Sequence, residues 1–303
     1  MIETEQTLSQ PRRSSDDAPG EAGGAPSEIL ETHETTIQPS SGWRAVNWAE
    51  MYEYRELLVF LIWRDISARY KQTILGGAWA IIQPLLMMII FTFVSRYAKT
   101  PMPPNIPIPV AVFAALIPWT MFNQGLSGSS LSLVNSLNMV TKVYFPRLFL
   151  PFTAAAVFLV DGLLATMVYA VLLAFYGIVP HWTVVFLPLL FALTLIATLS
   201  IGVLLAGLTL FYRDFKHIVP FLVQILMYMT PIFYTPAMFP EKYRLVLAFI
   251  NPMFGISDAF RSAILGTTMY WGPFLISSGV AIGLFIFSVH YFRRTERLFA
   301  DHV

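Results

Sequence analysis

The chain has 303 residues, of which 56% are hydrophobic and 12% are charged, and its formal net charge is +1. Soluble domains carry about 25% charged residues, so the composition excludes a typical soluble domain and indicates lipid as the main solvent. Cysteine is absent, which excludes disulfides and thiolate metal sites, and the balanced charge points to no nucleic-acid partner.

Residues 1–45 form an N-terminal segment that is rich in Ser, Pro, Gly, Glu and Thr, with eight acidic and three basic residues. Such a segment has too little apolar surface to offset the entropy of ordering. It also lacks the apolar core that follows the basic start of a signal peptide. We predict a disordered acidic cytosolic tail, which is either a plain linker or a docking segment for a partner.

Residues 46–74 change to an amphipathic pattern. Apolar or aromatic residues recur at i, i+4 on one face: Leu58, Ile62, Ile66 and Tyr70. Arg64, Ser67 and Lys71 fall on another face, and Asp65 is spaced to pair with Arg69. The pattern predicts an interfacial amphipathic helix in the cytosolic headgroup layer, with its cations toward anionic lipid. The alternative is an ordinary basic flank of the first membrane span.

Residues 75–297 hold six apolar stretches, and a helix of about 20 apolar residues spans a bilayer core. The predicted transmembrane helices are 78–97, 107–124, 148–176, 183–212, 218–234 and 273–292. One set of connecting segments carries ten Lys and Arg residues and the other set carries five. The positive-inside rule then places both termini, including 298–303, in the cytosol.

The connection between the fifth and sixth spans, residues 231–272, is long and mostly apolar, and it is interrupted by prolines at 231, 236, 240 and 252. An apolar loop of this kind is expected to return into the membrane, where it must lie against protein or a water-filled cavity. We predict two short re-entrant helices on the extracellular side. Simple packing against neighbouring spans is the alternative.

The sequence offers no catalytic or metal site. It has no G-x-x-x-x-G-K-[ST] phosphate loop, no His-Glu-x-x-His and no Gly-x-Ser-x-Gly. The ionisable residue at the centre of a span is Asp161. A carboxylate at that depth marks either a polar pathway or a buried pairing with a neighbouring helix.

Several short blocks occur in a fixed order along residues 57–297. They are Arg64-Asp65, Arg69-Tyr70-Lys71, Leu75-Gly76 with Trp79 and Pro84, Lys142-Val143-Tyr144-Phe145-Pro146-Arg147, Tyr212-Arg213-Asp214, Thr230-Pro231-Ile232-Phe233-Tyr234, and Asn251-Pro252 with Arg261. In these blocks the chain resembles the membrane permease subunit of ABC-2 type (type-2 ATP-binding-cassette) exporters, in particular the polysaccharide-exporting branch. The acidic tail lies outside the resemblance.

The resemblance implies a transport subunit rather than an enzyme. It implies a homodimer with a second copy of the chain and two copies of a cytosolic ABC ATPase, which would bind ATP and Mg, while this chain carries no cofactor. The implied function is export of a lipid-linked glycan of O-antigen, capsule or teichoic-acid type across the bacterial cytoplasmic (inner) membrane.

The resemblance also implies roles for individual residues. A short coupling helix is expected in a polar cytosolic loop, 127–142, and ATPase coupling is assigned to Ser136, Asn138, Thr141, Lys142, Tyr144, Arg213 and Asp214. From the basic face of the amphipathic segment we hypothesise, in addition, that Arg64, Arg69 and Lys71 contact the lipid headgroup by attracting a pyrophosphate. Pore or gating roles are assigned to Asp161, Pro231, Tyr234, Asn251, Pro252 and Arg261.

Three alternatives remain at this point. The first is an ABC-2 exporter of a drug or small lipid, although Arg69-Tyr70-Lys71 and Tyr144-Phe145-Pro146-Arg147 favour the glycan branch. A membrane-embedded glycosyl- or acyltransferase requires a convergent acid/base site. A secondary transporter requires ligands for a coupling ion, and one intramembrane Asp is weak support.

Overall fold

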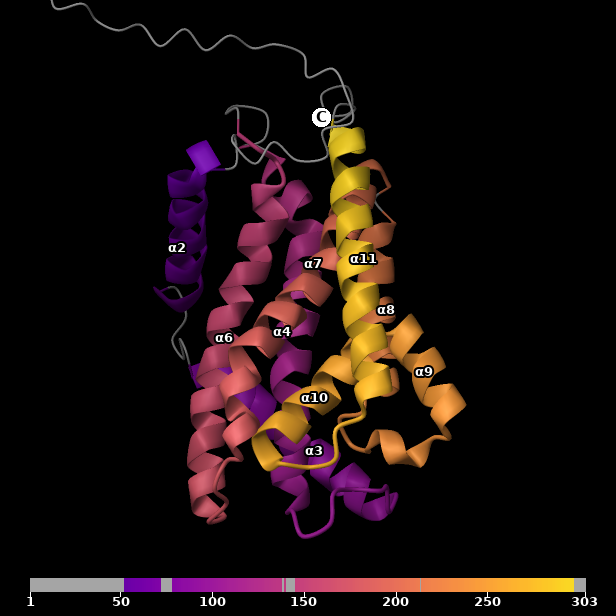
Figure 1. The fold of residues 1–303 in the computed structure, drawn as a ribbon. Helices are drawn as coiled ribbons and strands as arrows, with labels where there is room; N and C mark the ends of the chain where they lie inside the picture. Colours follow the sequence, from indigo (N-terminus) through magenta and orange to yellow (C-terminus); the bar gives the residue numbers. More distant parts are fainter. Residues whose placement is uncertain (1–51, 72–77, 138, 140–144, 213, 297–303) are drawn as a thin grey trace, which may run out of the picture. The chain divides into compact units, whose positions relative to one another are not determined.

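The computed structural model describes residues 52–71, 78–137, 139, 145–212 and 214–296. All regular secondary structure in these ranges is helical, which confirms the predicted all-α class. The predicted tail (1–45) and C-terminus (298–303) lie outside the described residues. The helices (Figure 1) are α2 (Arg55–Lys71), α3 (Ala78–Tyr97), α4 (Ile108–Asn135), α6 (Phe149–Phe175), η1 (Trp182–Phe186), α7 (Leu187–Phe211), α8 (Phe215–Met229), η2 (Pro236–Met238), α9 (Glu241–Ile250), α10 (Met253–Leu265) and α11 (Trp271–Glu296).

Four helices are long and apolar enough to cross a membrane: Ile108–Asn135, Phe149–Phe175, Trp182–Phe211 and Trp271–Glu296. The chain is therefore a multi-pass membrane protein. The other two predicted spans fall on shorter apolar helices, Ile81–Tyr97 and Phe215–Met229. At 1.5 Å per residue α8 rises only about 22 Å, less than the ~30 Å hydrocarbon core, so the count of six crossings stays a prediction.

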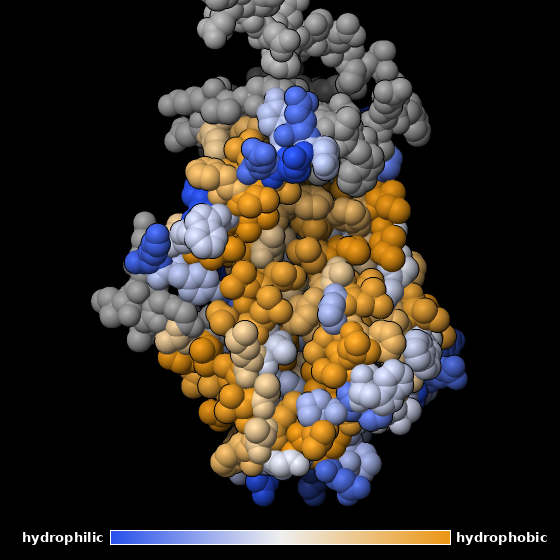
Figure 2. Space-filling model, turned by 60° about the vertical axis from the view of Figure 1, so that its left-hand side comes forward, coloured by the Kyte–Doolittle hydropathy of each residue, from blue (hydrophilic) through white to orange (hydrophobic). Residues whose placement is uncertain are grey.

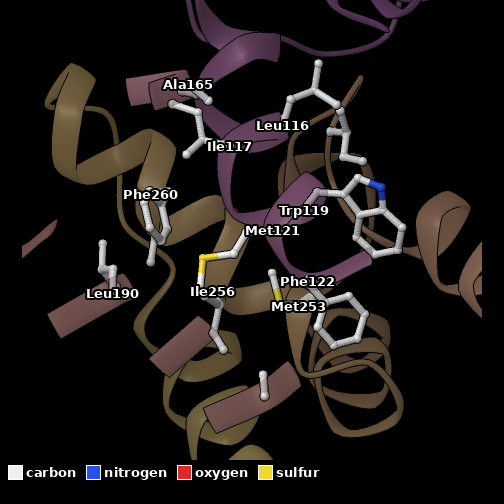
Figure 3. Packing of buried hydrophobic residues seen from close by; sticks show 14 of the residues in the cluster. Leu116, Ile117, Trp119, Met121, Phe122, Ala165, Leu190, Met253, Ile256 and Phe260 are labelled. Atoms are coloured by element: carbon white, nitrogen blue, oxygen red, sulfur yellow. The ribbon is translucent and has the colours of Figure 1, made fainter. Parts of the chain in front are cut away.

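α4 forms the centre of the helical bundle. It packs against α3, α6, α7, α8 and α10, and 78% of its most apolar window is buried within the protein. Figure 3 shows the core around it, in which α4 side chains meet residues of α7 and α10: Leu116, Ile117, Trp119, Met121, Phe122, Leu190, Ile256 and Phe260. The helix that the other helices surround is thus the second predicted span.

α4 also corrects one prediction, because it does not end at Gln124 but continues to Asn135. The first part of the predicted cytosolic loop, 127–135, is therefore helix, and its residues up to Leu133 are buried or half-buried. The hydroxyls of Ser127, Ser130 and Ser132 bond to carbonyls of the preceding turn, and that of Ser129 donates to Pro151 O of α6 at 2.8 Å, so they need no water. Small residues let α7 approach closely, since a Cβ on Gly202 would lie 2.7 Å from the Ser129 side chain.

α2 (Arg55–Lys71) lies within the segment 46–74 in which a helix was predicted, and it lies lengthwise along α6. Leu61, in its middle, belongs to the buried cluster that includes Phe149 at the start of α6. Tyr70, near its end, reaches Asp161 well inside α6. Figure 1 shows α2 beside the N-terminal half of α6. The predicted placement of α2 in the headgroup layer remains a prediction.

The region after α8 contains the two short helices that the prolines predict. α8 ends at Met229 rather than at Tyr234, because Pro231 lacks an N–H and keeps its predecessor out of the helical conformation; Thr230 has ψ 134°. The following α10 is buried nearly throughout and packs against α4, α7 and α11. α9 packs on α11 and leaves an apolar face exposed, with Tyr243, Val246, Phe249 and Ile250.

The surface carries the apolar belt that a membrane protein requires. In Figure 2 hydrophobic residues cover the middle of the face on view, and hydrophilic residues gather toward its two ends. Exposed apolar side chains come from several outer helices, including Phe93 of α3, Met167 of α6 and Phe287 of α11. In water such a surface would cause association, and in a bilayer it is the lipid-facing wall.

The contact between α10 and α11 depends on a glycine. A Cβ on Gly255 would lie 2.5 Å from the Pro273 carbonyl oxygen and 2.8 Å from the Phe274 Cα, and both are backbone atoms that cannot move aside. We expect Gly255→Ala to lower the stability of the purified protein by about 1–3 kcal/mol, the usual cost of overpacking.

The measurement is the fraction of monodisperse protein that survives heating in detergent. Gly283→Ala is the matched control, because nothing lies within 4 Å of its added Cβ, and in a helix Ala is favoured over Gly by roughly 1 kcal/mol. Equal survival of the two variants would contradict the close helix contact.

Candidate functional site

A polar cluster joins α2 to the interior of α6. Arg69 Nη2 donates to Asp161 Oδ2 at 2.8 Å and to Gln124 Oε1 of α4 at 2.9 Å. The Tyr70 hydroxyl donates a short hydrogen bond to Asp161 Oδ1. The Asp161 side chain is only 10% exposed, whereas that of Arg69 is 36% exposed. Asp161 is thus a buried carboxylate with two partners on α2.

The cluster extends to two more side chains. Gln124 Nε2 donates to Gln83 Oε1 of α3 at 3.4 Å, so four helices contribute to it. The Arg69 guanidinium carbon lies 4.5 Å from the centroid of the Phe158 ring of α6, a cation–π distance. Burial, followed by the hydrogen bond to Asp161, raises the pKa of the Tyr70 phenol, so Tyr70 keeps its proton and remains a donor.

The structure brings together two residues that the sequence assigned to different roles. Arg69 was predicted to contact lipid headgroups and Asp161 to line a pathway or form a buried pairing, and here they form one ion pair. The predicted pairing of Asp65 with Arg69 is wrong, because Asp65 binds Arg64 at 2.8 Å. Lys71, the third predicted headgroup cation, is exposed at the end of α2.

The residues predicted to couple to an ATPase fall mostly outside the described part of the chain, as is the case for Asn138, Thr141, Lys142, Tyr144 and Arg213. Of the two that are described, Ser136 caps the C-terminal end of α4. Asp214 precedes α8, and its carbonyl accepts from the His217 N–H at 3.0 Å.

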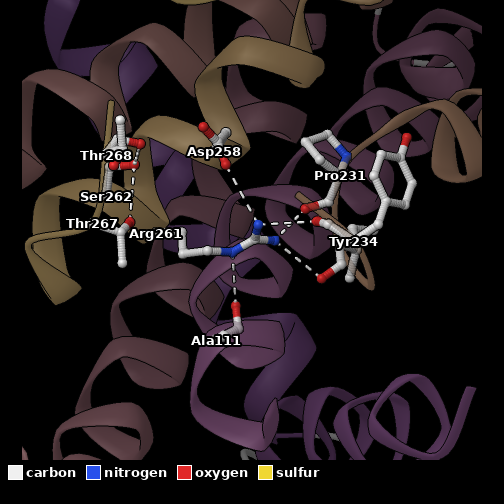
Figure 4. A network of polar contacts seen from close by, with 9 residues as sticks. Ala111, Pro231, Tyr234, Asp258, Arg261, Ser262, Thr267 and Thr268 are labelled. Carbon is white, nitrogen blue, oxygen red and sulfur yellow. Dashed lines mark hydrogen bonds and ion pairs between the residues drawn. The ribbon is translucent and has the colours of Figure 1, made fainter. Parts of the chain in front are cut away.

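A second cluster surrounds Arg261 of α10, whose side chain is 1% exposed (Figure 4). Its Nε donates to Ala111 O of α4 at 3.1 Å, and Nη1 donates to Tyr234 O at 3.0 Å. Nη2 donates to Ile232 O at 3.1 Å and, in a shorter bond, to Pro231 O. The partner carboxylate is Asp258, 3.4 Å from Nη1. Arg261 therefore holds the irregular backbone after α8 against α4 and α10.

Asn251 fixes the same irregular segment from the other side. Its Nδ2 donates to Leu226 O at 3.0 Å and to Thr230 Oγ1 at 2.9 Å, both at the end of α8. Its Oδ1 accepts from Met253 N at 3.0 Å, and Pro252 between them precedes the first turn of α10. Pro231, Tyr234, Asn251, Pro252 and Arg261 thus lie around one junction, where α8 ends and α10 begins.

Comparison with known proteins shows that residues 56–265 match the ABC-2 type transporter family. The chain belongs to that family. Both clusters lie within the matched range, since it includes every residue from Arg69 to Arg261. The family membership agrees with the resemblance inferred from the sequence blocks.

Relatives within the ABC-2 type transporters carry more specific descriptions. The O-antigen export system permease protein RfbA of Myxococcus xanthus is 29% identical over 214 residues, 70% of this chain and 82% of the relative. RfbA of Klebsiella pneumoniae is 27% identical over 247 residues, 81% of this chain and 94% of the relative. The polysialic acid transport protein KpsM of Escherichia coli is 25% identical over 228 residues, 73% and 83% of the two chains.

Four residues of the polar cluster around Asp161 were not among the predicted site residues: Tyr70, Gln83, Gln124 and Phe158. Tyr70 stood in the Arg69-Tyr70-Lys71 block, and Gln124 is a polar side chain within an apolar stretch. An intramembrane amide is itself a signal of a buried hydrogen-bond partner. Phe158 carried no signal among the many aromatic residues of the spans.

Proposed function

We propose that this chain is the membrane-spanning permease subunit of an ATP-driven exporter that moves a lipid-linked polysaccharide of O-antigen, capsule or teichoic-acid type across the bacterial cytoplasmic membrane. The observation that carries the proposal is the match to an O-antigen export permease over 81% of this chain and 94% of that relative. The similarity to a polysialic acid transport protein also supports a polysaccharide cargo.

The proposed topology has six crossings, with α3 and α8 completing the four longer helices and with both termini in the cytosol. A contact between the start of α6 and the end of α11 supports placing them on one side, because Arg147 N donates to Glu296 Oε1 at 3.3 Å. The opposite end holds α9 and α10, which we assign to the extracellular side as re-entrant helices. The bonds of Arg261 and Asn251 satisfy the non-helical backbone there, as membrane depth requires.

The proposed assembly is a homodimer with two copies of a cytosolic ABC ATPase, which bind ATP and Mg. Because a ligand shifts a conformational equilibrium only through a difference in affinity between two states, the ATPase must bind ATP better in one state of the dimer. Ser136 and Asp214, at the ends of α4 and α8 that we place in the cytosol, belong to the surface proposed to receive that change. Arg64 and Lys71 are exposed and remain candidates for contact with lipid headgroups.

The proposal is tested by purifying the tagged chain from native membranes in a mild detergent and identifying the associated proteins by mass spectrometry. We expect a P-loop ATPase in stoichiometric amount. Deletion of the chain is further expected to trap lipid-linked glycan on the cytosolic side and to remove it from the cell surface. Recovery of the intact dimer with no ATPase, or a normal surface glycan in the deletion strain, would contradict the proposal.

A further inference from the structure

An open cavity of about 270 Å3 lies between α2, α4 and α6. α2 contributes Asp65 and Arg69, and the end of α4 contributes polar and small residues: Gly128, Ser132, Asn135 and Ser136. α6 forms an apolar wall with Leu150, Ala154, Val157 and Phe158. The volume is just below the ~300–1,000 Å3 of typical small-molecule pockets, so it suits one ring rather than a chain of them.

The charges on the cavity wall are already neutralised within the protein. Asp65 is paired with Arg64 and Arg69 with Asp161, each at 2.8 Å. A phosphate bound to Arg69 would lie close to the carboxylates of Asp161 and Asp65, and both would repel it. The wall therefore disfavours a pyrophosphate and favours an uncharged ligand.

Hydrogen-bonding groups remain available on the polar side. The hydrogen bonds of Arg69 to Asp161 and Gln124 both use Nη2, so its Nε and Nη1 groups can still donate to a ligand. Asn135 is exposed and offers two donors and one acceptor, and Asp65 offers acceptor oxygens. A sugar hydroxyl both donates and accepts, and the C–H face of a sugar ring is apolar. The polar and apolar walls of the cavity match these two sides.

We infer that this cavity binds one uncharged sugar ring of the lipid-linked glycan, with its hydroxyls on Asp65, Arg69 and Asn135 and its C–H face on Ala154 and Val157. The inference rests on the proposed function and adds to it a recognition site for the sugar rather than for the phosphate. It also changes the role of Arg69 from attraction of a pyrophosphate to donation to sugar hydroxyls.

The absence of cysteine in the chain makes a direct test possible. Ala154→Cys places a single thiol on the apolar wall without removing a polar group, and Ser136→Cys is a second reporter at the other side of the cavity. Each full-length variant is reconstituted in lipid nanodiscs, and the rate of labelling by a water-soluble maleimide is measured. The probes are hexyl glucoside, hexyl galactoside and hexyl mannoside, compared with hexyl phosphate, which has the same tail and a charged head.

We expect at least one hexyl glycoside to slow labelling at both reporter positions, whereas hexyl phosphate does not. Asn135→Ala in the reporter background is expected to raise the half-protecting concentration up to about tenfold, as the loss of one or two hydrogen bonds would. Thr268→Cys, on the exposed loop after α10, is expected to label at the same rate with every probe.

Protection by hexyl phosphate alone, or by no probe at either reporter, would overturn the inference. The assay involves neither export nor an ATPase, so failure of the sugar site can be distinguished from failure of the proposed function. Protection by a glycoside without a co-purifying ATPase would support the sugar-binding cavity and contradict the proposed exporter function. Co-purification of the ATPase without protection would support the exporter function and contradict the sugar-binding cavity.

Discussion

Replacing Arg261 by methionine is expected to destabilise the protein by about 3–5 kcal/mol, the range found when one partner of a buried ion pair is removed. The substitution leaves the Asp258 carboxylate without its cation and leaves four backbone carbonyls, those of Ala111, Pro231, Ile232 and Tyr234, without their donor. We expect most of the variant to be lost as aggregate when membranes are solubilised. The measurement is the monodisperse fraction in size-exclusion chromatography, followed by thermal denaturation of the remainder.

Two further variants separate the effect of the unpaired Asp258 carboxylate from the effect of the backbone carbonyls that lose their donor. Arg244→Met removes a guanidinium that donates to one carbonyl, Phe239 O at 2.6 Å, and lies over Tyr270; we expect its effect to be about 1 kcal/mol. Asp258→Asn combined with Arg261→Met removes the unpaired charge and is expected to recover part of the loss but not all. Full recovery would mean that the ion pair, rather than the fixation of the backbone, explains the burial of Arg261.

Replacing Asp161 by leucine is expected to cost about 3 kcal/mol and to abolish export. The stability loss is placed at the lower end of the range for a broken buried pair because Arg69 is one-third exposed. The loss of export follows because α2 is then released from the middle of α6, where Arg69 and Tyr70 both hold the carboxylate. Stability is measured by denaturation in detergent, and export by the amount of surface glycan.

The double variant Arg69→Met with Asp161→Leu removes both charges and is expected to regain most of the stability, since an apolar replacement of a buried pair is often neutral or better. Export is expected to stay lost, because the polar link between α2 and α6 is still absent. Arg64→Met is the matched control on the same helix, and its exposed pair with Asp65 is worth at most about 1 kcal/mol. Normal export in the double variant would mean that the Arg69–Asp161 pair contributes to stability only and is not needed for export.

The sequence predicted two of the outer helices closely and the end of the buried one poorly. The predicted span 78–97 coincides with α3, and 148–176 differs from α6 by one residue at each end. These helices are mostly apolar, and α6 stops before Gly177, which takes the left-handed conformation (φ 65°) that ends helices. α4 continues past its predicted end because its serines are covered by α6 and α7 rather than by lipid. Hydropathy along one chain does not distinguish these two surroundings.

The sequence predicted several residues of the candidate sites, but it did not predict which of them contact one another. Asp161 and Arg69 are 92 residues apart, and the rules of helix spacing select only local pairs such as Asp65 with Arg69. Prolines around residues 231–252 revealed the interrupted backbone after α8. They contained no information on which side chain would satisfy its carbonyls, because Arg261 meets them only through the packing of α10.

The position of α4 has a consequence for how the protein is made. α4 is synthesised and inserted before α6 and α7, the helices that later cover it, and it has the lowest mean hydropathy of the four long spans. Several of its hydroxyls bond to carbonyls of α4 itself, as in Ser127 to Asn123, Ser130 to Ser127 and Ser132 to Ser129. These hydroxyls therefore have hydrogen-bond acceptors within α4 before α6 and α7 are inserted. This lowers the free-energy cost of inserting α4 into the bilayer ahead of the helices that cover it in the folded protein.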